Sequence, residues 1–326
     1  MNTKPHAQTQ NETFAKRGRA DFFSTNLKVA LHNANPSSPI RSRYLLSTFC
    51  TRELTKDGNK ITGKYCGQRW CVTCNRIRTA QLINSYLPEV QSITDPRFIT
   101  LTLKNCPGEQ LRERVQWMIK TWGQIQKKLA RRQGVKGYRK LEVTHNQKFN
   151  DFHPHFHAIV DGKDNARFII SEWLKLCKAA NIEALEEWQD DREADLGAMK
   201  ELFKYTAKIL PKKPKGKTWE EVFTDQGRVK RFLEGQDIIY QALYKIRTFQ
   251  PFGFKPLKEE KEEEERLELE AQETALNIPD GVYIRNGRGN WEHTFYPDKL
   301  HNRELGDEVI KLVNLMAGNF IRKLQI

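Results

Sequence analysis

The chain has 326 residues, 38% of them hydrophobic, which is enough to form a buried core in one large domain or two. Its formal net charge of +14 favours a polyanion such as a nucleic acid as the partner. No apolar run approaches the ~18 residues of a membrane span, and the N-terminus shows no signal-peptide core. We therefore expect a cytoplasmic protein that does not bind a membrane.

The N-terminal stretch is polar. Residues 1–40 contain scattered Lys, Arg, Asn, Ser and Pro with little periodicity. Segments of this composition bury too little apolar surface to fold by themselves. We expect a flexible N-terminal arm over 1–40, in which residues 21–31 can form a short helix.

A cluster of cysteines follows the arm, in a short segment that also carries Gly and Arg. Two cysteines in a Cys-x-x-Cys pair can bind one ion from a tight turn, and two more complete a tetrahedral set of thiolates for structural Zn²⁺. A redox-active or incidental Cys-x-x-Cys pair is the alternative. We predict a zinc-binding module and helix over 41–92, with the ligands Cys50, Cys66, Cys71 and Cys74.

Regular apolar patterns in the middle of the chain predict both strands and helices. Apolar residues alternate with Thr over 97–103, which is typical of a strand. Apolar residues at steps of three and four over 111–129 predict an amphipathic helix that packs on the sheet. Further helices are expected over 167–180 and 226–247, with an acidic connector at 190–195.

The sequence His-Pro-His-Phe-His predicts a strand with an imidazole face. Side chains alternate along a strand, so His153, His155 and His157 share one side. The preceding strand carries Glu142 and is joined by a short loop, which predicts an antiparallel hairpin with Glu142 beside the histidines.

A His/His/Glu set with open coordination positions suits Mg²⁺ or Mn²⁺ acting as a Lewis acid on a phosphate. Two simpler interpretations remain. The histidines can form a solvated polar face, and Glu142 can be a surface partner of Arg139 or Lys140.

A second set of reactive side chains lies further along the chain. At about 100° per residue, Glu201, Tyr205 and Lys208 fall within one stripe of a helix, and Leu202 and Phe203 lie on the opposite side. An amphipathic helix with such a surface stripe is common, so this motif does not decide the function by itself.

Basic residues near these motifs are candidates for contacts with nucleic-acid phosphates, because a flexible basic loop over 211–217 follows the helix and arginines flank the cysteines. They are Lys204, Lys212, Lys213, Lys215, Arg69 and Arg76. An acidic linker or helix is expected over 258–275. A C-terminal extension over 276–326, with short strands near 282–284 and 291–296, has no assigned role.

The order of these motifs resembles the plasmid rolling-circle replication initiators of the HUH endonuclease superfamily. The motifs are Phe-Ile-Thr-Leu-Thr, Glu-Val-Thr, His-Pro-His-Phe-His and Glu-x-x-Lys-Tyr-x-x-Lys, and the likeness is to the branch with one tyrosine and a glutamate one turn before it. The resemblance covers roughly residues 44–258. It implies an α+β fold with an antiparallel ferredoxin/RRM-like sheet flanked by helices. The endonuclease core is then expected over 93–257, after a small N-terminal zinc-binding module.

The resemblance also implies roles for the site residues. His155, His157 and Glu142 are then the ligands of a catalytic Mg²⁺ or Mn²⁺, and His153 is a neighbour. Tyr205 is expected to attack a phosphodiester, which gives a 5′-phosphotyrosine link and a free 3′-OH.

Termination and partners follow from the same family. Glu201 is expected to activate water for the final cleavage, while Lys208 and Lys204 steady the phosphate or the phenolate. The implied partners are plasmid origin DNA, single-stranded or extruded as a hairpin, and the host helicase, single-strand-binding protein and DNA polymerase.

Two alternatives to an initiator are considered. A single-strand transposase or a relaxase uses related chemistry, but relaxases place the tyrosine before the histidine motif, and two-tyrosine transposases have a tyrosine where Glu201 stands. A non-catalytic, zinc-containing nucleic-acid-binding protein predicts neither metal-dependent nicking nor a covalent DNA adduct.

Overall fold

The computed structural model describes residues 5–57, 60–132, 134–203, 215–254, 281–285 and 291–294. The chain forms two compact units. One comprises Met1–Ile77, Pro211–Leu233 and Lys258–Ile326, and the other comprises Arg78–Leu210 and Glu234–Leu257. Each compact unit gathers pieces that are far apart in the sequence. This division does not test the consecutive segment boundaries expected from composition, which stay a prediction.

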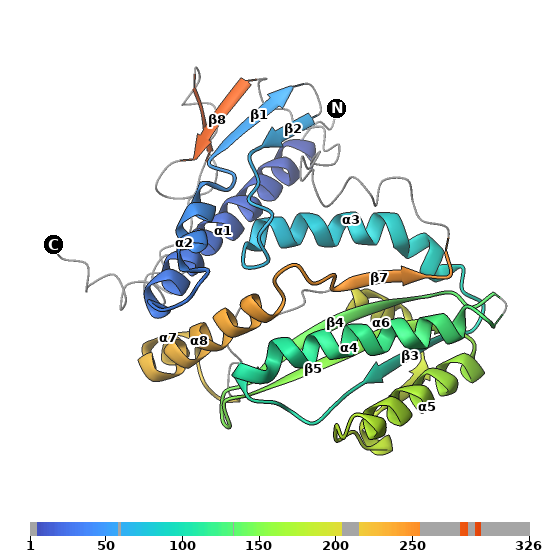
Figure 1. The fold of residues 1–326 in the computed structure, drawn as a ribbon. Coiled ribbons are helices and arrows are strands. Elements are labelled where there is room, and N and C mark those ends of the chain that lie inside the picture. The colour runs from blue at the N-terminus through green and yellow to red at the C-terminus, as the bar shows by residue number, and fades with distance from the viewer. Residues whose placement is uncertain are drawn as a thin grey trace. The chain divides into compact units, whose positions relative to one another are not determined.

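The second unit is built on a five-stranded antiparallel sheet (Figure 1). In spatial order its strands are β6 (Asp190–Glu193), β3 (Pro96–Leu101), β5 (Asp151–Asp161), β4 (Gly137–Asn146) and β7 (Phe249–Phe252). The expected α+β class, an antiparallel sheet flanked by helices, is confirmed. One element differs, because the stretch expected to be an acidic connector begins with the edge strand β6.

Helices α4 (Gly108–Leu129) and α5 (Lys163–Ala179) cover one face of this sheet (Figure 1). The apolar stripe of α4 is buried at the predicted three- and four-residue steps. Phe156 of β5 packs between the two helices, with its ring centroid 5.7 Å from that of Trp122 and 5.8 Å from that of Trp173. The aromatic side chains of this stripe therefore form core.

The opposite face is covered in part by helix α6 (Leu196–Leu202) and by the second half of α3 (Val72–Gln91). Their apolar side chains pack on Phe98, Tyr138 and Ile159, which lie side by side on β3, β4 and β5. Leu202 and Phe203 are buried here, as the helical pattern predicts. Because side chains alternate along β5, Ile159 shares this face with the three histidines. Helix α8 (Gln226–Ala242) has residues in both units.

The first unit begins with a 30-residue helix, α1 (Pro5–Ala34), in place of the expected flexible arm. Leu27 and Leu31 are buried, and so are the polar Asp21, Ser24 and Lys28. Composition predicts a flexible arm here because polar residues are usually in contact with water. It does not show that these polar groups find partners inside the unit. The helix is correspondingly much longer than the expected 21–31.

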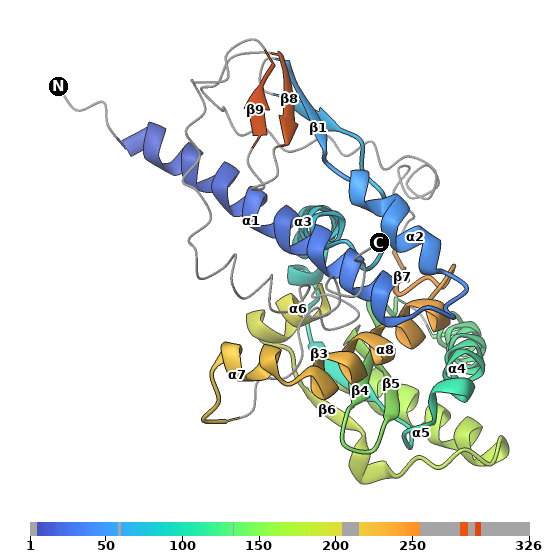
Figure 2. The same ribbon diagram turned by 90° about the vertical axis from the view of Figure 1, so that its left-hand side faces the viewer.

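Short elements complete this unit around a four-stranded sheet of order β2-β1-β8-β9. They are α2 (Arg41–Leu46), the 3₁₀ helix η1 (Ser47–Phe49), β1 (Glu53–Asp57), β2 (Lys60–Gly63), α7 (Trp219–Thr224), β8 (Gly281–Arg285) and β9 (Trp291–His293). The two expected C-terminal strands are therefore confirmed. Figure 2 shows β8 beside β1. Arg285, the last residue of β8, pairs with the buried Asp21. No helix in the described part of the chain is long and apolar enough to cross a bilayer.

Candidate metal centres and active site

Three predicted ligands meet on the face of the sheet that α6 covers in part. In the strand register Glu142 lies opposite His155, and His157 lies between Thr100 and Lys140. One ligand atom from each of Glu142, His155 and His157 falls within 4.8 Å of the others. The Nε2 atoms of the two histidines are 3.2 Å apart, and His157 Nε2 is 3.9 Å from Glu142 Oε2.

The rings of both histidines are oriented through their other nitrogen. His155 Nδ1–H donates to the carbonyl oxygen of His153 at 3.1 Å, and His157 Nδ1 lies 3.1 Å from Thr100 Oγ1. With the proton on Nδ1, the Nε2 lone pair of each ring points into the same space. Two lone pairs so close repel each other unless a proton or a cation lies between them. The donor set therefore fits a divalent metal ion.

Burial keeps the imidazoles of His155 and His153 neutral. Burial, and then the neighbouring His157, lowers the pKa of His155 to about 4. Burial, and then His155, lowers the pKa of His153 to about 4 as well. A neutral imidazole is the form that binds metal, so at neutral pH the His155 ring is ready to act as a ligand. His153 contributes its backbone carbonyl to the orientation of His155.

Lys140 belongs to this site and was considered from the sequence only as a surface partner of Glu142. Its side chain is only 1% exposed, and its Nζ lies 3.1 Å from Glu142 Oε2. The ion pair is therefore buried beside the histidines. The signal in the sequence was the two-residue spacing, which puts Lys140 and Glu142 on the same face of β4. Glu142 thus has both an ammonium partner and two histidine neighbours.

The predicted nucleophile lies outside the described residues. So do Lys204, Lys208, Lys212 and Lys213, together with the expected acidic segment 258–275. Glu201 is in the last turn of α6, where the backbone but not its side chain is described, and Tyr205 follows Leu202 by three residues. Lys215 is exposed.

The four cysteines of the first unit converge. Sγ of Cys50 lies 3.5 Å from that of Cys74 and 3.6 Å from that of Cys71, and the Cys66 and Cys74 sulfurs are 3.7 Å apart. A tetrahedral zinc with Zn–S bonds of about 2.3 Å places its sulfurs about 3.8 Å apart. The spacing therefore fits a four-thiolate zinc site that includes Cys50. Arg69 is half-buried and Arg76 exposed next to this cluster.

Helix α1 supplies polar contacts to the cluster that the sequence did not reveal. Ser24 Oγ donates to Cys71 Sγ at 3.4 Å, and Lys28 is fully buried with its Nζ 2.9 Å from the Ser47 carbonyl oxygen. Burial by itself lowers the pKa of Lys28, but the neighbouring sulfurs of Cys71, Cys66 and Cys50 outweigh it, and the pKa is raised. A buried ammonium next to a set of thiolates offsets their negative charge.

The fold and the site together define a class of protein. It is an α+β protein with a His/His/Glu set on its sheet and a separate four-cysteine cluster. The family model for replication proteins matches residues 59–275, a range that holds three of the four cysteines of the cluster, the His/His/Glu set and the predicted tyrosine. The chain belongs to this family of replication proteins.

Curated relatives named "Protein rep" support the same family. The chain is 29% identical over 104 residues to the protein of Streptococcus pneumoniae serotype 2, which covers 29% of this chain and 32% of that protein. It is 32% identical over 128 residues to a Staphylococcus aureus protein, a match that covers 34% of this chain and 54% of that protein. It is also 32% identical over 88 residues to a Bacillus sp protein, a match that covers 26% of this chain and 29% of that protein. The chain thus matches about a third to a half of the length of these relatives. No solved structure matches it significantly.

Proposed function

We propose that this chain initiates plasmid rolling-circle replication by nicking one strand of the double-strand origin. The observation that carries the proposal is the convergence of Glu142, His155 and His157, with both Nε2 atoms directed at one point. These residues share a sheet face with α6, the helix that leads toward Tyr205. Membership of the replication-protein family supports this assignment.

The proposed reaction is a transesterification at phosphorus. Tyr205 Oη attacks the scissile phosphate, a P–O bond to tyrosine forms, and the P–O3′ bond breaks. The phenolic proton ends on the leaving oxygen, which becomes the free 3′-OH used by the host polymerase. His155, His157 and Glu142 hold Mg²⁺ or Mn²⁺, which as a Lewis acid polarises the phosphate. Lys140 holds the Glu142 carboxylate in place.

Hydrolysis is proposed for the final cleavage. Glu201 takes a proton from water, the water oxygen attacks phosphorus, a P–O3′ bond breaks at the regenerated origin, and the proton passes from Glu201 to the leaving 3′ oxygen. The new 3′-OH then attacks the phosphotyrosine, which forms a P–O3′ bond, breaks the P–O bond to Tyr205 and returns the proton to the phenol. Lys208 and Lys204 stabilise charge on the phosphate and the phenolate.

Further residues bind DNA and stabilise the fold. The DNA backbone is bound by the basic residues Lys212, Lys213, Lys215, Arg69 and Arg76. A structural Zn²⁺ on Cys50, Cys66, Cys71 and Cys74 stabilises the first unit. Host helicase and single-strand-binding protein act on the same plasmid DNA in the cytoplasm.

A denaturing gel tests the proposal. Labelled single strands and hairpins from the origin region are incubated with the protein and Mn²⁺, and covalent adducts appear as a slower band. The band is expected for the wild type and for the control Tyr244→Phe, and it is expected to disappear with Tyr205→Phe or with EDTA. An adduct that persists in Tyr205→Phe overturns the assignment of the nucleophile. Tight binding without cleavage of any hairpin favours a non-catalytic DNA-binding protein.

A further inference from the structure

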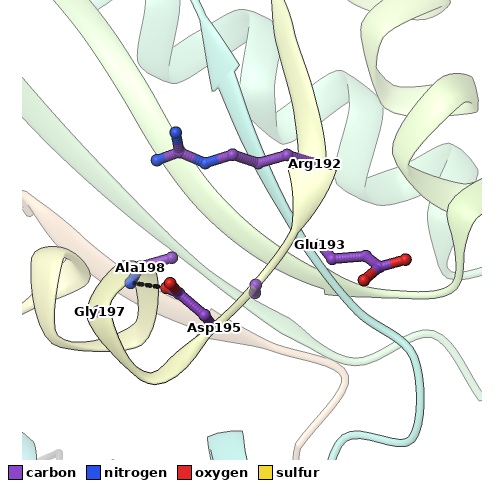
Figure 3. Close-up of a pocket in the computed structure, with 6 residues that line it drawn as sticks. Arg192, Glu193, Asp195, Gly197 and Ala198 are labelled. Carbon is purple, nitrogen blue, oxygen red and sulfur yellow. Dashed lines mark hydrogen bonds between the residues drawn. The ribbon is translucent and has the colours of Figure 1, made fainter.

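A cavity of about 510 Å³ opens where β6 leads into α6 (Figure 3). It is lined by Arg192, Glu193, Ala194, Asp195, Gly197 and Ala198. Binding pockets for small ligands have volumes of about 300–1,000 Å³, so the cavity is large enough for one nucleotide. None of the functions assigned above uses it.

The cavity adjoins the face that carries the histidines. Arg192 lies opposite Phe98 in the strand register, and its guanidinium carbon is 4.8 Å from the centre of the Phe98 ring. The Phe98 ring centroid is in turn 5.2 Å from that of His157. Two successive contacts, from Arg192 to Phe98 and from Phe98 to His157, therefore connect the cavity wall with a candidate metal ligand. One or two nucleotides of a single strand can span that separation.

Two side chains give the cavity a chemical character. Arg192 is 58% exposed and is stacked on Phe98, and a planar guanidinium stacks well on a nucleobase. Asp195 Oδ1 accepts a hydrogen bond from the Ala198 backbone N–H at 2.7 Å, which holds the carboxylate in place. In Figure 3 the Arg192 and Asp195 side chains lie on the same side of the β6–α6 connection, and Glu193 points away from them.

We propose that this cavity binds one base of the single-stranded substrate beside the scissile phosphate. Arg192 stacks on the base, and Asp195 accepts a hydrogen bond from an exocyclic amino group. Adenine, cytosine and guanine carry such a group. Thymine instead presents carbonyl oxygens on both sides of its single N–H, and these repel a carboxylate. The cavity therefore selects an amino-bearing base at this position. The proposal rests on the proposed nicking function.

Equilibrium binding in EDTA tests the cavity without cleavage. Fluorescence anisotropy is measured with a series of origin oligonucleotides in which each position in turn carries thymine or an abasic site. For the wild type, an abasic site at one position near the nick is expected to weaken binding about tenfold, and thymine there several-fold. Arg192→Ala is expected to weaken binding about tenfold and to lose the response to the abasic site.

Two further variants separate stacking and hydrogen bonding from charge. Arg192→Lys keeps the charge without the plane and is expected not to restore binding. Asp195→Asn keeps the acceptor at the start of α6 but loses the charge, so the preference over thymine is expected to fall several-fold. Arg131→Ala, which removes an exposed arginine after α4, is the charge control and is expected to keep the positional response. Unchanged circular dichroism and melting temperature establish that each variant is folded.

The outcomes distinguish the cavity from the nicking function. If Arg192→Ala and Arg131→Ala behave alike, or if the wild type responds to no position, the cavity proposal is wrong even when the covalent adduct forms. If a positional preference depends on Arg192 and Asp195 but no adduct forms, base binding by the cavity is retained, whereas the nicking function, and with it the position beside a scissile phosphate, is overturned.

Discussion

Replacement of Thr100 by valine tests whether the His/His/Glu set is built to hold a metal. Thr100 Oγ1 lies 3.1 Å from His157 Nδ1 and is the contact through which the His157 ring is oriented. Valine has nearly the same shape but offers no acceptor. If the site binds metal, a ring that is free to rotate or to carry its proton on Nε2 is a weaker ligand.

The expected size follows from the burial of this contact. Loss of a hydrogen-bond partner behind a metal ligand costs about 10–100-fold in metal affinity, or about 1.4–2.7 kcal/mol. Thr100 is half-buried, so water can replace part of the lost interaction. We therefore expect a loss of about tenfold, at the lower end of that range.

Manganese binding is measured by electron paramagnetic resonance without DNA, and adduct formation is then followed as a function of Mn²⁺ concentration. In Thr100→Val both curves are expected to shift to about tenfold higher Mn²⁺, and the rate at saturating Mn²⁺ is expected to recover. Thr144→Val is the matched control. Thr144 lies on the same face of the sheet as Glu142, but it is opposite His153, which is four residues from His157 along β5. Equal Mn²⁺ dependence in the two variants refutes the role of Thr100.

Three further expectations concern the cysteine cluster and the helices. Elemental analysis is expected to find one zinc per chain, lost in Cys71→Ser but retained in Cys177→Ser, whose thiol is buried outside the cluster; equal zinc content in the two variants contradicts the site. Lys28→Met is expected to lose zinc to a chromogenic chelator several-fold faster than the wild type, because a buried positive charge next to the thiolates is gone, and an unchanged rate argues against charge compensation. Hydrogen bonds from Lys128 and Lys175 lower the pKa of Glu172, so its contribution to stability is present above the unfolded value of about 4.5 and is lost as the pH falls through the folded value. Because both lysines are largely exposed, Glu172→Gln is expected to cost about 1 kcal/mol in urea unfolding at pH 7 and progressively less as the pH falls below 4.5, and a cost independent of pH refutes the ion pairs as its source.

Periodicity made the central part of the fold predictable. The two-residue alternation of β5 puts His155 and His157 on one face because the backbone allows no other arrangement of an extended strand. The short loop after β4 likewise predicts which strand brings Glu142 to them. The structure contains this antiparallel hairpin, and it adds the register, with Glu142 opposite His155.

Other elements depend on partners that no local pattern shows. β6 has three acidic residues and no apolar alternation, yet it pairs with β3, and its Asp191 accepts from Arg97 Nε at 2.9 Å. The first unit contains a similar case that sequence spacing does not predict. Asp21 is buried and pairs with Arg285, which is far from it in the sequence. Long-range ion pairs of this kind have no signature in sequence spacing.

The ligand set depends on contacts made on the other face of the sheet. A slip of one residue between β4 and β5 would move Glu142 away from the histidines and into the core under α4. Two positions of β4 oppose such a slip. A Cβ at Gly137 would lie 2.3 Å from the Ile159 carbonyl oxygen, so only glycine fits where the strands approach. Arg139 is buried with its guanidinium 4.8 Å from the Phe156 ring and donates to Gln250 Oε1 at 2.8 Å. Burial of an arginine costs free energy, and this one is held by contacts that exist in a single register, so the core side of the hairpin determines where the metal ligands meet.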